Sequence, residues 1–125
     1  MRHISRGFLS TLVVFVVLGS TGVSKTESPV TPGELAANPD KYDGKHVVVR
    51  GFVAIGPHER NIFDSKQGYE RPGGTCLGLL GPESFLKRSR KRVETVSGIF
   101  HKALCGQNDI CLYWCSEAGI KVDAK

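Results

Sequence analysis

The sequence predicts a mainly β fold in which five strands close into a barrel. Three observations indicate this class. Beyond residue 45, most apolar residues fall in short runs that are separated by turns rich in glycine and proline. Two of these runs, 49–53 and 96–100, share an apolar-x-Gly-x-apolar pattern, which is expected of strands that bend at a glycine. Helix-start signals lie between the third and the fourth run.

A short helix is predicted at the start of the domain. Thr31-Pro32-Gly33-Glu34 combines a capping threonine, a proline at the first helical position and a glutamate three residues after the cap. The helix is expected to include residues 35–37 and to end at Asn38-Pro39. Asp43-Gly44 then predicts a turn into the first strand.

The first predicted strand, residues 46–55, is apolar on both faces. Such a strand is either central or bends across two sheets, and Gly51 offers a place to bend. We expect the next segments to be a polar loop, a short strand, a glycine-rich loop and a third strand, at 56–61, 62–64, 67–74 and 75–80.

The second half of the chain is expected to begin with a helix of two to three turns, which starts near Glu83 and continues through the basic run at 87–92. Strands are then predicted at 93–100, 110–115 and, as a short terminal strand, 119–122. In the second of these, we expect Trp114 to be buried and Tyr113 to pack on a disulfide. The resulting order, β-β-β-α-β-β, is that of an OB-fold, a five-stranded Greek-key barrel with one helix between strands 3 and 4.

The same residues resemble a known group of proteins. Leu35, Asn38-Pro39, Tyr42 and 44–51, followed by Val96-Ser97-Gly98-Ile99-Phe100, are similar to small exported bacterial proteins with an OB-like domain. The segment 44–51 also resembles the opening strand of the OB domains that bind tRNA anticodons. This resemblance covers residues 31–123 and implies the fold. Because its motifs are a turn, a strand and a bend, it implies no catalytic residue.

The N-terminus has the three parts of a secretory signal peptide. Arg2 and Arg6 precede an apolar run at 8–18, and small residues follow at 19–24. Cleavage is expected after Gly22 or after Ser24, with an uncleaved anchor as the alternative. We therefore predict a signal peptide at 1–22, a flexible leader at 23–30 and an OB-like domain at 31–125, in a periplasmic or secreted protein without a membrane anchor after cleavage.

Four cysteines lie in the exported part, an even number that predicts two disulfides in an oxidising compartment. If Cys111 and Cys115 share a strand, their Cα atoms are about 13 Å apart and cannot be bridged. Of the two remaining patterns, we favour Cys105–Cys111 with Cys76–Cys115 over Cys76–Cys111 with Cys105–Cys115. A zinc site formed by His101, Cys105, Cys111 and Cys115 is the alternative, but the ligand spacing fits it poorly.

The positive charge of the chain is local. The formal net charge is +5, but two of the 17 basic residues are in the signal segment and five are in the run 87–92. Outside that run the exported part has 10 basic and 12 acidic residues. A general polyanion-binding surface is therefore not indicated, and the run itself is interpreted as the solvated face of a helix or, alternatively, as a polyanion site.

The sequence contains no nucleophile motif, no phosphate-binding loop and no suitably spaced pair of carboxylates. We therefore expect no enzyme, cofactor or metal, and predict a binding module for an envelope protein or for a small or polymeric ligand. An oligonucleotide- or polyanion-binding domain and a small hydrolase are the alternatives, although an exported protein meets little nucleic acid. The sequence does not predict the oligomeric state. The candidate ligand-binding residues are His58, Arg60, Tyr69, Arg71, Arg88 and Arg90.

Overall fold

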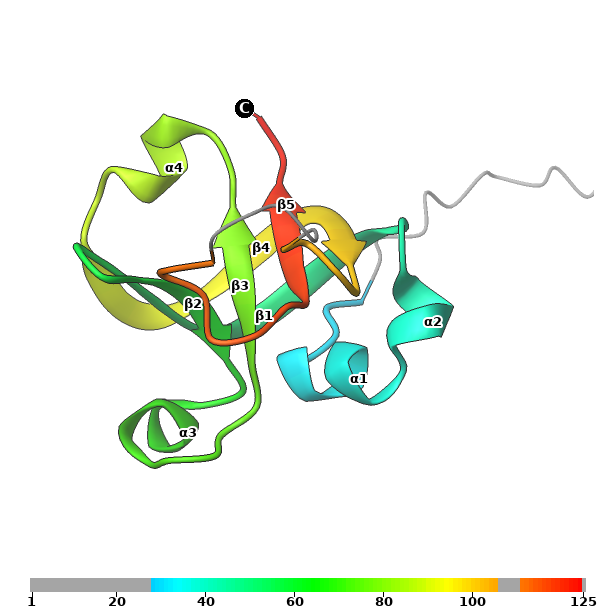
Figure 1. Cartoon of the computed structure of the whole chain (residues 1–125), viewed down its shortest axis with the longest axis horizontal. Coiled ribbons are helices and arrows are strands. Elements are labelled where there is room, and N and C mark those ends of the chain that lie inside the picture. Colours follow the sequence, from blue (N-terminus) through cyan, green and yellow to red (C-terminus); the bar gives the residue numbers. More distant parts are fainter. Residues whose placement is uncertain (1–27, 106–110, 125) are drawn as a thin grey trace, which may run out of the picture.

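Five strands form a closed barrel in the computed structural model, which describes residues 28–105 and 111–124 (Figure 1). The strands are β1 (His46–Gly56), β2 (Glu59–Phe63), β3 (Cys76–Leu80), β4 (Arg90–His101) and β5 (Gly119–Val122). Their order around the barrel is β1-β2-β3-β5-β4, and β4 closes on β1. The predicted mainly β, OB-like barrel is therefore confirmed.

The long strand β1 joins the two sides of the barrel. It is antiparallel to β2 from Phe52 to Gly56 and antiparallel to β4 from His46 to Ile55. The barrel closes through a parallel pairing of β3 with β5 and an antiparallel pairing of β5 with β4. The two predicted bend glycines lie at close approaches, because a Cβ on Gly51 would collide with β2 and a Cβ on Gly98 would collide with the backbone of β5.

The core fills the barrel and extends under the first helix. Leu35 of α1 (Pro32–Ala37) is fully buried together with side chains of all five strands. The buried cluster consists of Leu35, Val47, Val49, Val53, Ile55, Ile62, Leu77, Leu79, Val96, Phe100 and Ile120.

The N-terminal helix forms as predicted, with one difference in its cap. Thr31 Oγ1 accepts a hydrogen bond from the Glu34 amide at 3.1 Å, and Asn38 ends the helix. The Glu34 carboxylate does not return to the cap but accepts from the Tyr42 hydroxyl at 2.6 Å, which ties α1 to α2 (Pro39–Tyr42). Gly44, with φ of 75°, makes the predicted turn into β1.

The sheet includes one residue that lies before the predicted start of the OB-like domain. Val30 forms a parallel bridge with Val49, and its N–H and C=O hydrogen-bond to Val48 and Arg50 at 2.8 and 3.0 Å. The end of the expected leader is therefore part of the sheet edge. The predicted signal peptide lies outside the described residues. Within the part of the chain that the structure describes, no helix is long and apolar enough to cross a membrane.

Two predicted segments are wrong in detail. The expected loop at 67–74 contains a helix, α3 (Lys66–Glu70), capped by Ser65, whose Oγ accepts from Gly68 N at 3.1 Å. The expected basic helix ends early, because α4 (Glu83–Leu86) is a single turn. Arg90 to Arg92 instead begin β4, where they pair with β1 from Ile55 to Val53.

The predicted strand at 110–115 is also wrong. Residues 111–115 form turns rather than a strand, and the fifth strand of the barrel is β5. Both favoured disulfides are nevertheless present, Cys76–Cys115 and Cys105–Cys111. Since these bonds use every cysteine, no thiolate remains for the alternative zinc site. Two disulfides in so small a domain indicate an oxidising environment.

Candidate binding surface

The β1–β2 turn and the cysteine-rich connection before β5 meet at one end of the barrel. Gly56 pairs with Glu59, so Pro57 and His58 form a tight turn. Beyond the end of β3, the Arg60 amide donates to the Tyr113 carbonyl at 3.0 Å. The connection therefore continues the hydrogen bonding of β2 where a neighbouring strand is missing.

Asn61 holds this connection on the barrel. Its side chain is 6% exposed, Nδ2 donates to the Tyr113 carbonyl at 3.1 Å, and Oδ1 accepts from the Cys115 amide at 2.8 Å. Both ends of one buried amide thus satisfy backbone groups, which would cost free energy if they were left unpaired.

The connection covers the outer face of β3. The Trp114 ring lies over Gly78, where a Cβ would collide with it, and Nε1 donates to the Leu79 carbonyl at 3.0 Å. The Cys76–Cys115 disulfide fixes the same segment to the start of β3, and in Figure 1 this segment, in orange, crosses in front of β3. OB domains that bind single strands use aromatic platforms on β2 and β3. Here part of that face is covered by the chain itself.

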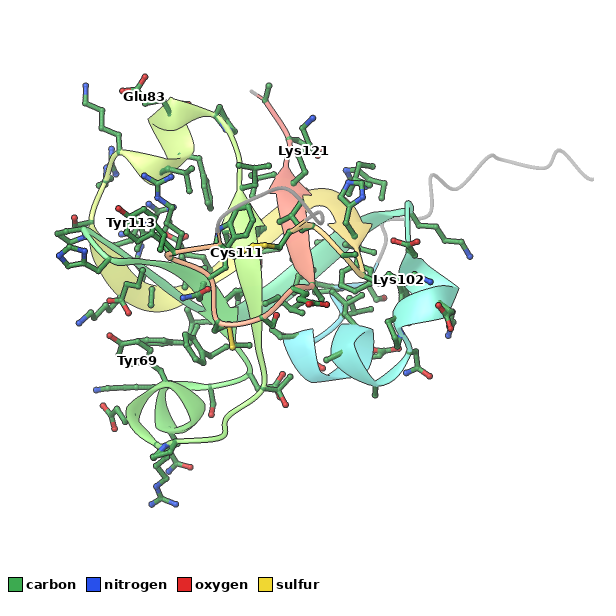
Figure 2. All side chains as sticks on the ribbon, in the orientation of Figure 1. Tyr69, Glu83, Lys102, Cys111, Tyr113 and Lys121 are labelled. Atoms are coloured by element: carbon green, nitrogen blue, oxygen red, sulfur yellow. A yellow bond between two sulfur atoms is a disulfide. The ribbon has the colours of Figure 1, made fainter. Side chains whose placement is uncertain are left out.

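Three exposed residues, His58, Leu112 and Tyr113, lie next to this crossing together with the half-buried Arg60, and we name these four residues the Tyr113 patch. The Arg60 guanidinium lies over the Tyr113 ring, 5.5 Å from its centroid, and the His58 ring centroid is 6.2 Å from that of Tyr113. Leu112 is 72% exposed. The turn at 112–113 directs Tyr113 to the β1–β2 turn (Figure 2), and its packing on a disulfide stays a prediction.

A shallow groove of about 480 Å³ adjoins the Tyr113 patch. The β1–β2 turn and Arg60 line one side, α4 and the residues after it line the other, and Leu80 is 37% exposed in it. The groove and the patch together offer apolar, aromatic and cationic contacts over a surface shared by three segments of the chain.

Tyr69, a predicted site residue, instead attaches α3 to the barrel (Figure 2). Its ring packs on Phe52 and Phe63 at centroid distances of 5.4 and 5.1 Å, and its hydroxyl donates to the Glu59 carboxylate at 3.0 Å. The Tyr69 phenol and the Glu59 carboxylate raise the pKa of Lys91, which lies 3.6 Å from Glu59. Arg71 is exposed just after α3.

Arg90 is a structural residue. Its side chain is 10% exposed, it donates to Glu94 Oε1 at 2.8 Å and to the carbonyls of Phe85 and Arg88, and it stacks on the Phe85 ring. Arg92 donates to the same Glu94 oxygen at 2.6 Å. Burial alone would raise the pKa of Glu94, but the hydrogen bonds from both arginines outweigh it and lower the pKa.

Arg88 is exposed on a second, larger groove of about 1030 Å³ between α4 and β4. Arg50, Arg90 and Arg92 also line this groove. Lys87 and Arg88 form no ion pair with a described residue, whereas Arg90, Lys91 and Arg92 each contact a carboxylate. Much of the basic run is thus neutralised within the domain.

The structure therefore brings together His58 and Arg60 in the Tyr113 patch and Arg88 and Arg90 beside the larger groove, and it places Tyr69 on α3 and Arg71 just after it. Sequence reasoning missed Leu112 and Tyr113 as surface residues. Their position between Cys111 and Cys115 was the available signal, because a short segment between two disulfide-bonded cysteines is constrained even without a strand.

The described residues show no group of three histidine, cysteine or acidic side chains that could hold a metal ion. His46 and Asp123 approach to 2.7 Å, but both are 45% exposed, and the pair ties the segment after β5 to the start of β1. No family model, curated protein or solved structure matches the chain.

Proposed function

We propose that this chain is an exported, disulfide-stapled OB-like module without enzymatic activity, which binds a protein or a small or polymeric ligand in the cell envelope through the Tyr113 patch. Export is supported by the charged and apolar N-terminus, by the two disulfides and by the resemblance to small exported bacterial proteins with an OB-like domain.

The observation that carries this proposal is the convergence of His58 and Arg60 with Tyr113 and the exposed Leu112. Tyrosine and arginine are among the residue types that contribute most at binding surfaces, since they combine apolar area with directed polar groups. Asn61, Trp114 and the Cys76–Cys115 disulfide hold the patch in place before any ligand arrives. Such preorganisation lowers the entropy cost of binding.

Polyanion binding through the basic run is a second candidate, favoured by the arginines that line the larger groove. Its support is weaker, because Glu59 and Glu94 already pair with three of the five cations. Lys87 and Arg88 are left as the main exposed charges of the run.

Photo-crosslinking from the Tyr113 patch tests the proposal. A benzophenone amino acid at Leu112 in the native cell should give adducts of discrete mass, and Arg60→Ala in the same chain should remove them. The control carries the same group at Lys66 on α3, whose side chain is 71% exposed. Equal adducts from both positions, or adducts that survive Arg60→Ala, would contradict the patch as the binding surface.

A further inference from the structure

The first half of β4 has one edge without a partner strand. β4 pairs with β1 over Arg90–Ile99, but with β5 only over Gly98–His101. On the side away from β1, Ser97 O accepts from Asp123 N at 3.0 Å. Between Arg90 and Val96 no described strand continues the sheet on that side.

The register shows which backbone groups face this open edge. Phe100 N donates to Lys45 O at 3.0 Å and Phe100 O accepts from Gly44 N at 2.8 Å, so Phe100 directs both groups toward the β1 side. The pairing with β1 continues without a bulge to Arg90, and strand residues alternate in direction. Lys91, Val93 and Thr95 therefore direct N–H and C=O away from β1, where no described group hydrogen-bonds them.

The open edge borders the larger groove. Val93 and Thr95 line its β4 side, and Pro82 and Phe85 line its α4 side. Val93 is 52% exposed, although its side chain is apolar and β-branched. Unpaired N–H and C=O groups along an edge are a template for an added strand, which needs about 4.8 Å beside the existing one. A groove of about 1030 Å³ offers space for a short extended peptide.

The charges around the edge favour an acidic occupant. Arg50 and Arg88 are exposed, line the groove and form no ion pair with a described residue. The acids in this region are already engaged, Glu94 by Arg90 and Arg92, and Asp123 by His46. An added strand with carboxylates would gain charge-assisted contacts beside its backbone hydrogen bonds.

We propose that the open edge of β4, at Lys91, Val93 and Thr95, binds an acidic peptide segment of a partner protein as an added strand. This goes beyond the proposed function, since the edge and the Tyr113 patch use different residues. A peptide fits better than a second copy of β4. In a dimer formed through this edge, the α4 of each copy would lie in the same groove and would obstruct the α4 of the other copy.

The test uses the protein as it is exported and a fluorescein-labelled peptide of alternating glutamate and valine. Val93→Pro removes the N–H that faces the groove and leaves the β1–β4 hydrogen bonds in place, because proline is tolerated where a strand N–H faces outward. Val93→Thr is the matched control. We expect fluorescence anisotropy to show binding that Val93→Pro weakens about tenfold or more and Val93→Thr leaves unchanged.

Two N-methylated peptides decide the result even if Val93→Pro does not fold. One carries the methyl groups on its valine amides and the other on its glutamate amides. Because alternate residues face β4, only one of the two should lose binding. Equal binding of both would overturn the added strand, as would a Val93→Pro protein that folds and binds like wild type.

The other occupants give different outcomes. A dimer in sedimentation equilibrium that Val93→Pro dissociates would assign the edge to a second copy instead. Single-stranded DNA that displaces the peptide, with binding lost in Arg88→Gln but kept in Val93→Pro, would show a polyanion site rather than a strand site. Leu112→Ser, in the Tyr113 patch, should leave the peptide affinity unchanged, which separates this proposal from the proposed function.

Discussion

The side chain of Asn61 hydrogen-bonds a chain segment that lies beside β2 where β3 does not extend. β3 pairs with β2 only from Asn61 to Phe63, so the turn side of β2 has no β3 partner. The Asn61 amide and the Arg60 N–H together bind the backbone of Tyr113 and Cys115 at 2.8 to 3.1 Å. A nearly buried polar residue on a strand is here explained by the two backbone groups that it satisfies.

Asn61→Ala should therefore lower the free energy of unfolding by about 2–3 kcal/mol, because it leaves the Cys115 N–H without its acceptor and removes one donor from the Tyr113 carbonyl. His58→Ala is the control at a neighbouring exposed position and should change the free energy of unfolding by less than about 0.5 kcal/mol. Urea unfolding monitored by the fluorescence of Trp114, the single tryptophan of the chain, measures both. Equal losses in the two variants would contradict the role of Asn61.

Individual residues were predictable where local chemistry decides their role. The Thr31 cap and the Gly44 turn follow from short-range pattern. The favoured cysteine pairing is also correct, but the exclusion of a Cys111–Cys115 bond assumed a strand that residues 111–115 do not form. Partners across the barrel were not predictable. Lys91 on β4 reaches Glu59 on β2 across β1, which pairs with both strands, and no local pattern contains this contact. Tyr69 was assigned to a binding surface for the same reason, since its partners Phe52 and Phe63 lie on two other elements.

At the level of elements, glycine sets how closely the strands approach. An added Cβ at Gly98 would meet the backbone of Lys121 and the side chain of Ile120, both on β5. At Gly56 the nearest atom, Glu59 Cγ, would be 3.6 Å away, an ordinary contact. A side chain is therefore tolerated at Gly56 but not at Gly98.

Gly98→Ala should destabilise the protein by about 2–3 kcal/mol, because the backbone of β5 would have to move away from β4. Gly56→Ala should stay within about 0.5 kcal/mol of wild type. Chemical denaturation gives both values, and amide hydrogen exchange should show faster exchange in β5 for Gly98→Ala alone. A Gly98→Ala protein as stable as Gly56→Ala would mean that β5 does not lie this close to β4.

The elements that the sequence predicts correctly are those with β-branched runs or strong turns, such as β1 and the end of β4. The helix across the basic run was wrong because ten residues of β4 pair with β1, and this pairing outweighs the local preference of Arg90 to Arg92. The strand at 110–115 was wrong although its apolar residues alternate. Asn61, Trp114 and the two disulfides together hold residues 111–115 in turns.

For the molecule as a whole, the two disulfides have different structural roles. Cys105–Cys111 closes a loop of sequence separation 6 within one connection. Cys76–Cys115 joins residues 39 apart and attaches that connection to the barrel beside β2. In a domain this small, the longer bridge limits the unfolded chain and also keeps the Tyr113 patch assembled.

Removing the two bridges in turn should separate these effects. In the chain-entropy model, Cys76→Ser with Cys115→Ser should lower the free energy of unfolding by about 4 kcal/mol, and Cys105→Ser with Cys111→Ser by about 2 kcal/mol. Only the first pair should also release the Arg60 contact with Tyr113, which NMR can detect through the ring-current shift of the Arg60 side chain. Equal stability losses would contradict the dependence on loop length. An unchanged Arg60 shift in the first pair would show that Asn61 and Trp114 hold the patch without the bridge.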